Sequence, residues 1–114
     1  MRFPRWSFAA LALLVSLAAP MANGVVAEEY TVSIKGKSFS PKALRIRPGD
    51  TIRFVNDDLV THDIYSLTQG HFFTSGRQAP GKHAVFVFNR PGAFDVISAA
   101  EFDNMKLNVE VAAR

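Results

Sequence analysis

The sequence predicts an all-β fold, an antiparallel sandwich of two sheets, and three observations support that prediction. Apolar and polar residues alternate with a period of two in almost every segment after residue 27. Turn signals, among them Pro48-Gly49-Asp50 and Pro91-Gly92, separate these segments at regular spacing. No segment of the sequence carries an apolar stripe at helical spacing. Short alternating segments between such turns are typical of a sandwich whose inner faces pack together.

Strands are expected where the alternation is clearest: 30–34, 43–47, 51–55, 62–66, 84–88, 94–98 and 105–111. Residues 39–42 form a short edge-like piece, because Pro41 cannot donate a hydrogen bond to a neighbouring strand. In the segment 84–88, Phe86 and Phe88 share one face and Val85 and Val87 the other. Residues 68–82 show no period and contain three glycines and a proline, so a long loop is expected there.

Residues 1–27 are typical of a secretion signal peptide. Arg2 and Arg5 give it a positive start, and residues 8–19 form an apolar stretch interrupted only by Ser16. About a dozen apolar residues fall short of the roughly 20 that span a bilayer. We therefore expect a periplasmic protein that has no membrane attachment after cleavage. An uncleaved membrane anchor is the alternative.

Two cleavage positions fit the small residues that follow the apolar stretch, one after Ala22 and one after Ala27. Ala27 is favoured, because Val25-Val26-Ala27 approximates the small-x-small pattern of cleavage sites. Residues 28–114 then form one domain, as the length of 114 residues allows. The chain has no cysteine and therefore no disulfide, so the hydrophobic core, with 10 phenylalanines in the whole sequence, has to hold the domain together.

Charge and motifs argue against several classes of function. The net charge is +3, but without Arg2 and Arg5 only 11 basic residues remain against 10 acidic ones. No basic stripe with interleaved aromatic residues is present, so no nucleic-acid partner is expected. Ser98, His62 and Asp63 invite comparison with a hydrolytic set, but Ser98 lacks the glycines of a nucleophile elbow. We therefore expect a protein that is not an enzyme.

The chain resembles the cupredoxins, the plastocyanin-like small copper proteins, over essentially the whole segment 28–114. The matching pieces, in order, are Phe39-Ser40-Pro41, Leu44-Arg45-Ile46, the run from Pro48 to Asn56, Asp58 with His62, Pro80-Gly81, Phe86-Val87-Phe88, and Pro91-Gly92-Ala93-Phe94. Each piece is a weak motif, and the order and spacing of all of them make the signal specific. The resemblance implies a cupredoxin-like Greek-key β-sandwich. Asp58 and His62 resemble the family's acidic residue and its first copper-binding histidine.

In that family, copper lies between two loops, and the last loop supplies Cys, His and usually Met. Here, counting from Gly92, Ser98 takes the place of the Cys and Glu101 that of the His. A shift by one residue places Ala99 and Phe102 there instead, with Met105 at a common spacing. A thiolate and two imidazoles make the blue copper site. Without the thiolate, the resemblance implies neither that site nor the usual electron transfer.

The candidate metal site is His62, Glu101 and Met105, a mixed set of nitrogen, oxygen and sulfur donors for copper or another transition metal. Asp103 is a spare oxygen donor at this site. His71, in the predicted long loop, is placed near the same end of the sandwich as an additional candidate. His83 matches no ligand position.

The alternative function is a degenerate cupredoxin that binds a protein partner without metal. The partner would dock at the end of the sandwich that holds His62 and Met105. Phe72, Phe73 and Phe102 would form the exposed contact patch.

Overall fold

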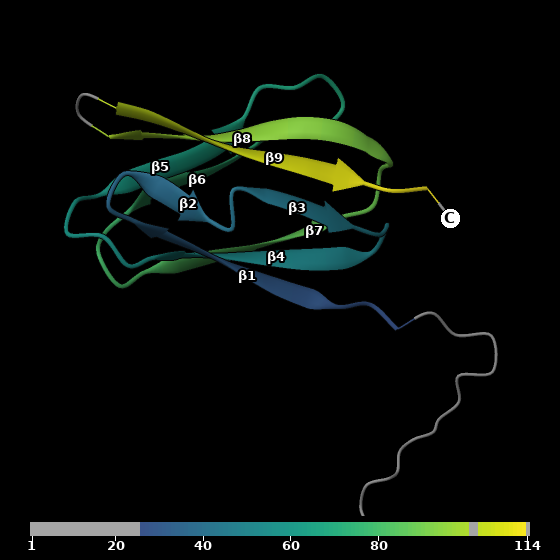
Figure 1. Cartoon of the computed structure of the whole chain (residues 1–114), viewed down its shortest axis with the longest axis horizontal. Helices are drawn as coiled ribbons and strands as arrows, with labels where there is room; N and C mark the ends of the chain where they lie inside the picture. Colours follow the sequence, from purple (N-terminus) through teal and green to yellow (C-terminus); the bar gives the residue numbers. More distant parts are fainter. Residues whose placement is uncertain (1–25, 101–102, 114) are drawn as a thin grey trace, which may run out of the picture.

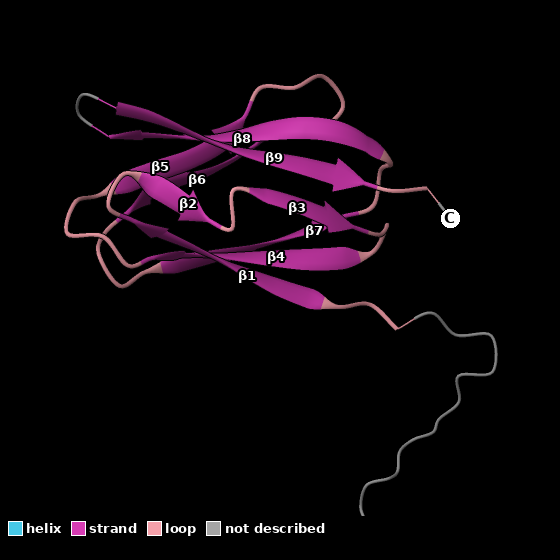
Figure 2. Cartoon of the chain, viewed as in Figure 1, coloured by secondary structure: helices cyan, strands magenta, loops and turns pink. Residues whose placement is uncertain are grey.

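The computed structural model describes residues 26–100 and 103–113, and these residues form nine β-strands and no helix (Figure 2). The strands are β1 (Glu29–Lys35), β2 (Ser38–Ser40), β3 (Ala43–Ile46), β4 (Asp50–Asn56), β5 (His62–Ser66), β6 (Phe73–Gln78), β7 (His83–Phe88), β8 (Gly92–Ala100) and β9 (Asp103–Val111). No helix in this described part of the chain is long and apolar enough to cross a membrane. The predicted signal peptide lies outside the described residues, except for Val26 and Ala27.

Two sheets stack face to face, with β8 and β9 above β1 and β4 in the view of Figure 1. One sheet has four strands in the order β2-β1-β4-β7, and the other has five in the order β3-β9-β8-β5-β6. The predicted all-β sandwich is therefore confirmed.

The expectation of antiparallel pairing throughout is wrong for two strand pairs. β1 runs parallel to β4, and β3 runs parallel to β9. The chain leaves the four-stranded sheet after β2, forms β3 in the other sheet and returns as β4. A crossover of this kind brings β4 beside β1 in the same direction, whereas a tight hairpin gives only an antiparallel pair.

The segment 68–82 is not a loop throughout, because β6 occupies Phe73–Gln78 at the edge of the five-stranded sheet. Its register against β5 shifts between Asp63 and Tyr65. Such an irregularity breaks the period of two on which the sequence-based prediction relied. Only Phe73 of this strand packs against the core, so the strand lacks the apolar alternation of the others.

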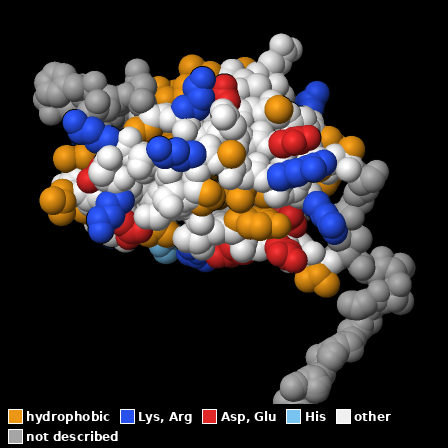
Figure 3. Space-filling view, viewed as in Figure 1, with side chains coloured by type: hydrophobic (Ala, Val, Ile, Leu, Met, Phe, Trp, Pro, Cys, Tyr) orange, Lys and Arg blue, Asp and Glu red, His pale blue; other side chains and the backbone are white. Residues whose placement is uncertain are grey.

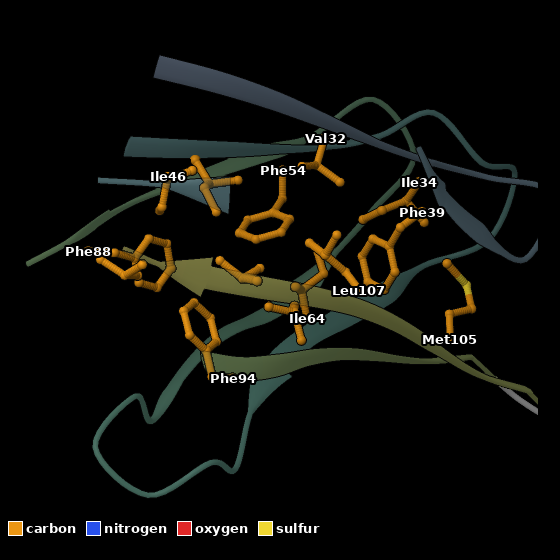
Figure 4. Packing of buried hydrophobic residues seen from close by; sticks show 14 residues of the cluster. Val32, Ile34, Phe39, Ile46, Phe54, Ile64, Phe88, Phe94, Met105 and Leu107 are labelled. Atoms are coloured by element: carbon orange, nitrogen blue, oxygen red, sulfur yellow. The ribbon is translucent and has the colours of Figure 1, made fainter. Parts of the chain in front are cut away.

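The core fills the space between the sheets with aliphatic and aromatic side chains (Figure 4). Its buried members are Val32, Ile34, Phe39, Ile46, Ile52, Phe54, Ile64, Phe88, Phe94, Val96, Met105, Leu107, Val109 and Val111. In β7, Phe86 and Phe88 face this core and Val85 and Val87 are exposed, as the alternation predicts. On the face seen in Figure 3, basic and acidic side chains are interspersed.

Candidate functional site

His62 is the first residue of β5, and its side chain lies between the two sheets. The residues of this strand alternate between buried and half-buried, and His62, Ile64 and Ser66 are on the buried side. Only 1% of the surface of His62 is exposed. A buried imidazole is stable only when its ring nitrogens have hydrogen-bond partners or a metal. Both ring nitrogens of His62 have such partners.

The first partner is Ser98 of β8, whose Oγ lies 2.6 Å from Nδ1 of His62. β8 lies beside β5, and Ser98 pairs with Ile64, which is on the same face of β5 as His62. This pairing places the side chain of Ser98 close to that of His62. Ser98 is fully buried. This contact joins His62 to Ser98, one of the two residues that the sequence offered for the cysteine position.

The second partner is Asp58, whose Oδ2 lies 2.9 Å from Nε2 of His62. Oδ1 of the same carboxylate accepts a hydrogen bond of 2.8 Å from the backbone N–H of Leu59. The hydrogen bond from His62, followed by that from Leu59, lowers the pKa of Asp58 below its usual value. The ionised carboxylate can only accept, so Nε2 carries the ring proton. In the neutral imidazole, Nδ1 is then the unprotonated nitrogen and accepts from the Ser98 hydroxyl.

Asn56 holds the turn that carries Asp58 in place. This residue ends β4 and has no exposed surface. Its Nδ2 donates to the carbonyl oxygens of Val60 and Gln78 at 2.9 and 2.8 Å, and its Oδ1 accepts from the backbone N–H of Asp58 at 2.9 Å. One buried amide thus fixes the start and the end of the β4–β5 turn. The sequence shows Asn56 only as a turn residue, and its three hydrogen bonds were not expected.

Met105 lies on β9 directly opposite Ser98, as its Cα partner in the β8–β9 ladder. It is 5% exposed and belongs to the buried core cluster, as does Phe39 (Figure 4). Ser98 is buried as well, so the two side chains occupy the inner face of the same sheet. The structure therefore brings His62 to Ser98, and Ser98 beside Met105. Glu101 and Phe102 lie outside the described residues, and the ladder around them extends to the pair Ala100 and Asp103.

His71 does not lie near His62, contrary to the expectation that the long loop folds over the same end. It follows β5 at the far end of that strand. Its ring stacks on Phe94 with centroids 4.6 Å apart, and its Nε2 lies 2.9 Å from the carbonyl oxygen of Arg90. β5 carries the chain away from His62, and His71 lies in the connection beyond the far end of β5, before β6 brings the chain back to pair Gln78 with His62. His83 is exposed at the start of β7.

Asp63 does not complete a set with His62 and Ser98. It lies on the opposite face of β5, where its Oδ1 accepts from Thr74 Oγ1 at 3.2 Å. The acidic partner of His62 is Asp58 instead, the residue that the family resemblance had singled out. The Ser98 hydroxyl at the other end of this chain of hydrogen bonds has no exposed surface.

The expected aromatic patch of Phe72 and Phe73 is also not beside the site. Ser66 pairs with Phe73, which places both residues at the end of β5 away from His62. Phe72 is 67% exposed, whereas Phe73 packs against the core. The apolar side chains exposed near His62 are instead Leu59 and Val60 of the β4–β5 turn, at 91% and 50%.

The donor types on this inner face suit a soft metal ion better than a hard one. Within the described residues, no three His, Cys, Asp or Glu side chains gather as a metal site. The inner face offers one imidazole nitrogen, one thioether from Met105 and the neutral hydroxyl of Ser98. Imidazole and thioether are ligands that copper accepts, and thioether favours Cu(I). A carboxylate that holds the other imidazole N–H is the usual companion of a metal-binding histidine.

Comparison with solved structures identifies the fold. The copper-containing nitrite reductase from Thermus scotoductus SA-01 matches with a TM-score of 0.68 and 28% identity, over 82% of this chain and 24% of that one. The chain thus spans about a quarter of that enzyme. A novel purple cupredoxin from Nitrosopumilus maritimus matches with a TM-score of 0.61 and 24% identity, over 73% of this chain and 99% of that one. No family model and no curated protein matches.

Amicyanin, in the reduced state of a mutant, gives a TM-score of 0.64 at 17% identity, over 73% of this chain and 81% of that one. These likenesses confirm the resemblance inferred from the sequence: the chain has the cupredoxin fold. The sequence contains no cysteine, so the thiolate ligand that the family resemblance would imply is absent from this chain.

Proposed function

We propose that this protein is a periplasmic cupredoxin that binds copper through a non-blue site and does not serve as a blue-copper electron carrier. The ligands are Nδ1 of His62 and the thioether of Met105, with Glu101 as the third donor. The observation that carries the proposal is the hydrogen bond between Asp58 and Nε2 of His62. In the neutral imidazole this bond leaves Nδ1 as the unprotonated nitrogen, toward Ser98 and the inner face that also carries Met105.

Copper binding in this site requires the Ser98 hydroxyl to give up its bond to Nδ1. A hydrogen bond between neutral groups contributes about 0.5–1.5 kcal/mol net. Even micromolar affinity corresponds to roughly 8 kcal/mol. The Ser98 bond is therefore a minor cost, and the hydroxyl fills the site when copper is absent.

An anaerobic titration of the purified protein with Cu(I), in competition with a chromophoric chelator, tests the proposal. We expect one Cu(I) per chain, with affinity reduced at least about tenfold in His62→Ala and in Met105→Leu. Met105→Leu nearly conserves side-chain volume, so the fold should persist. Glu101→Gln tests the third donor, and His83→Ala, at an exposed histidine, is the matched control. Equal affinity in wild type and His62→Ala would refute the site.

Partner binding without metal is the second candidate, and one observation favours it. Leu59 and Val60 expose apolar surface on the β4–β5 turn. The preceding residue, Asp58, holds the His62 ring by a hydrogen bond. Two adjacent exposed apolar side chains beside a buried polar network are a candidate contact for another protein. The copper titration separates the two functions, because a protein that binds no Cu(I) at micromolar concentration leaves only this one.

A further inference from the structure

Asp50 is a buried carboxylate that belongs to no site described above. It is 3% exposed and begins β4. Its Oδ2 accepts a hydrogen bond of 2.9 Å from the backbone N–H of Arg47, which closes the Pro48-Gly49 turn. Its Oδ1 accepts a hydrogen bond of 2.9 Å from the backbone nitrogen of Glu28. A negative charge with so little exposed surface is stabilised most by a positive partner.

The nitrogen of Glu28 is held in place by the four-stranded sheet. The carbonyl oxygen of Glu28 accepts a hydrogen bond of 2.9 Å from the backbone N–H of Thr51. The parallel β1–β4 ladder begins at the next residue, with Glu29 paired to Thr51. Val26 and Ala27, which precede Glu28, are exposed. The position of the Glu28 nitrogen therefore depends on β4 and not on the chain before it.

We propose that cleavage between Ala27 and Glu28 turns this nitrogen into an α-ammonium group that forms an ion pair with Asp50. A peptidase uses water to break the Ala27–Glu28 amide bond. The hydroxyl of the water goes to the Ala27 carbonyl carbon, and the Glu28 nitrogen leaves as an amine. An α-amino group with an ordinary pKa near 8 is mostly protonated at neutral pH. Processing thereby replaces a neutral donor to Asp50 by a charged one.

The ion pair links the cleavage position to the stability of the fold. Charge-assisted hydrogen bonds are roughly twice as strong as neutral ones. Cleavage after Ala22 would begin the chain at Asn23, and the Glu28 nitrogen would remain an amide. Only cleavage after Ala27 places the new positive charge against Asp50. The mature protein is then more stable than any form with residues ahead of Glu28.

The experiment uses the full chain, exported and purified from the periplasm, and a variant with Gly-Ser-Gly inserted between Ala27 and Glu28. The variant keeps the signal and the cleavage site but leaves the Glu28 nitrogen as an amide. Mass spectrometry establishes the first residue of each product, and urea unfolding gives its stability. We expect the wild-type product to begin at Glu28. We expect the insertion to raise the unfolding equilibrium constant about fivefold.

A cycle with Asp50→Asn isolates the proposed pair. In that background the insertion should change the unfolding constant less than about twofold, since no carboxylate remains to pair with the ammonium. The matched control is Asp95→Asn, at an exposed carboxylate on β8, in which the insertion should cost as much as in wild type. A product that begins at Asn23, an insertion without effect, or an equal effect in Asp50→Asn would each overturn the proposal.

A second measurement applies even if Asp50→Asn does not fold. The α-amine of the wild-type product should react with an acylating reagent at least about fivefold more slowly than the α-amine of the inserted variant. The paired ammonium gives up its proton less readily, and its nitrogen is held against Asp50. Equal rates would show that the pair does not form.

Discussion

Ser98 Oγ lies 2.6 Å from Nδ1 of His62, across the β5–β8 pair. The family resemblance offered His62 for the first copper-binding histidine, and either Ser98 or Ala99 for the copper-binding cysteine. Here the hydroxyl and the imidazole bind each other, and Asp58 holds the far side of the ring. The imidazole of His62 is thus held from both sides, and one of its two partners is a residue that the resemblance singled out.

Ser98→Cys should restore a thiolate beside His62. When Cu(II) is added, we expect an intense visible thiolate-to-copper absorption that wild type lacks, because wild type contains no thiol. Ser98→Cys with Glu101→His should strengthen that absorption, since the set of two imidazoles, thiolate and thioether is then complete. Ultraviolet–visible spectroscopy checks both proteins.

The control for this prediction moves the same chemistry by one residue. Ala99→Cys with Phe102→His carries an identical pair of ligands in the alternative register. The Ser98 contact leads us to expect no intense absorption from this pair. Colour from the Ala99 and Phe102 pair alone would show that the register assigned here is off by one.

Asp58→Asn should remove a pH-dependent part of the stability of the copper-free protein. The folded-state pKa of Asp58 is lowered, so its contribution is present above the unfolded pKa of about 4. It is lost as the pH falls through the lower folded value. At pH 7 we expect Asp58→Asn to cost about 1 kcal/mol, and well below pH 4 we expect the difference from wild type to vanish. Urea unfolding at both pH values measures it, and a constant difference would contradict the assignment.

The fold was predictable because alternation and turn residues are local signals, whereas the parallel pairs are not. Between β1 and β4 the chain passes through the other sheet as β3. No residue pattern in β1 or β4 indicates that the two strands pair with each other. β6 was missed for a different reason, since its bulge and its single core contact at Phe73 erase the period of two. In both cases the missing information is in contacts between distant segments.

The candidate site, like the fold, could be predicted from the sequence only in part. His62 and Met105 could be named from the resemblance, and spacing alone left Ser98 and Ala99 as alternatives. The hydrogen bond from Ser98 to His62 was not predictable from the spacing, because it depends on the β5–β8 register and not on the loop sequence. The sequence also placed His71 with the site, although β5 carries the chain to the opposite end before His71 is reached. Because β5 lies between His62 and His71, the two histidines are at opposite ends of that strand.

Asn56→Ala should destabilise the protein more than any other single change in the β4–β5 turn. The substitution leaves the carbonyl oxygens of Val60 and Gln78 and the N–H of Asp58 without their amide partner. We expect a loss of about 2–4 kcal/mol in the free energy of unfolding, since buried groups without partners cost about 1–3 kcal/mol each and part of the turn can relax toward water. Asn108→Ala, at an exposed position in β9, is the control and should change stability by less than about 1 kcal/mol.

His71→Ala should separate stability from copper binding. The ring stacks on Phe94 and bonds to the Arg90 carbonyl oxygen, so its loss should cost about 1–2 kcal/mol in the free energy of unfolding. Because His71 lies at the end of the sandwich away from His62, Cu(I) affinity should stay within about twofold of wild type. Urea unfolding and the competition titration give the two numbers on one sample. A loss of copper affinity with unchanged stability would place the metal at His71, and the site at His62 would have to be abandoned.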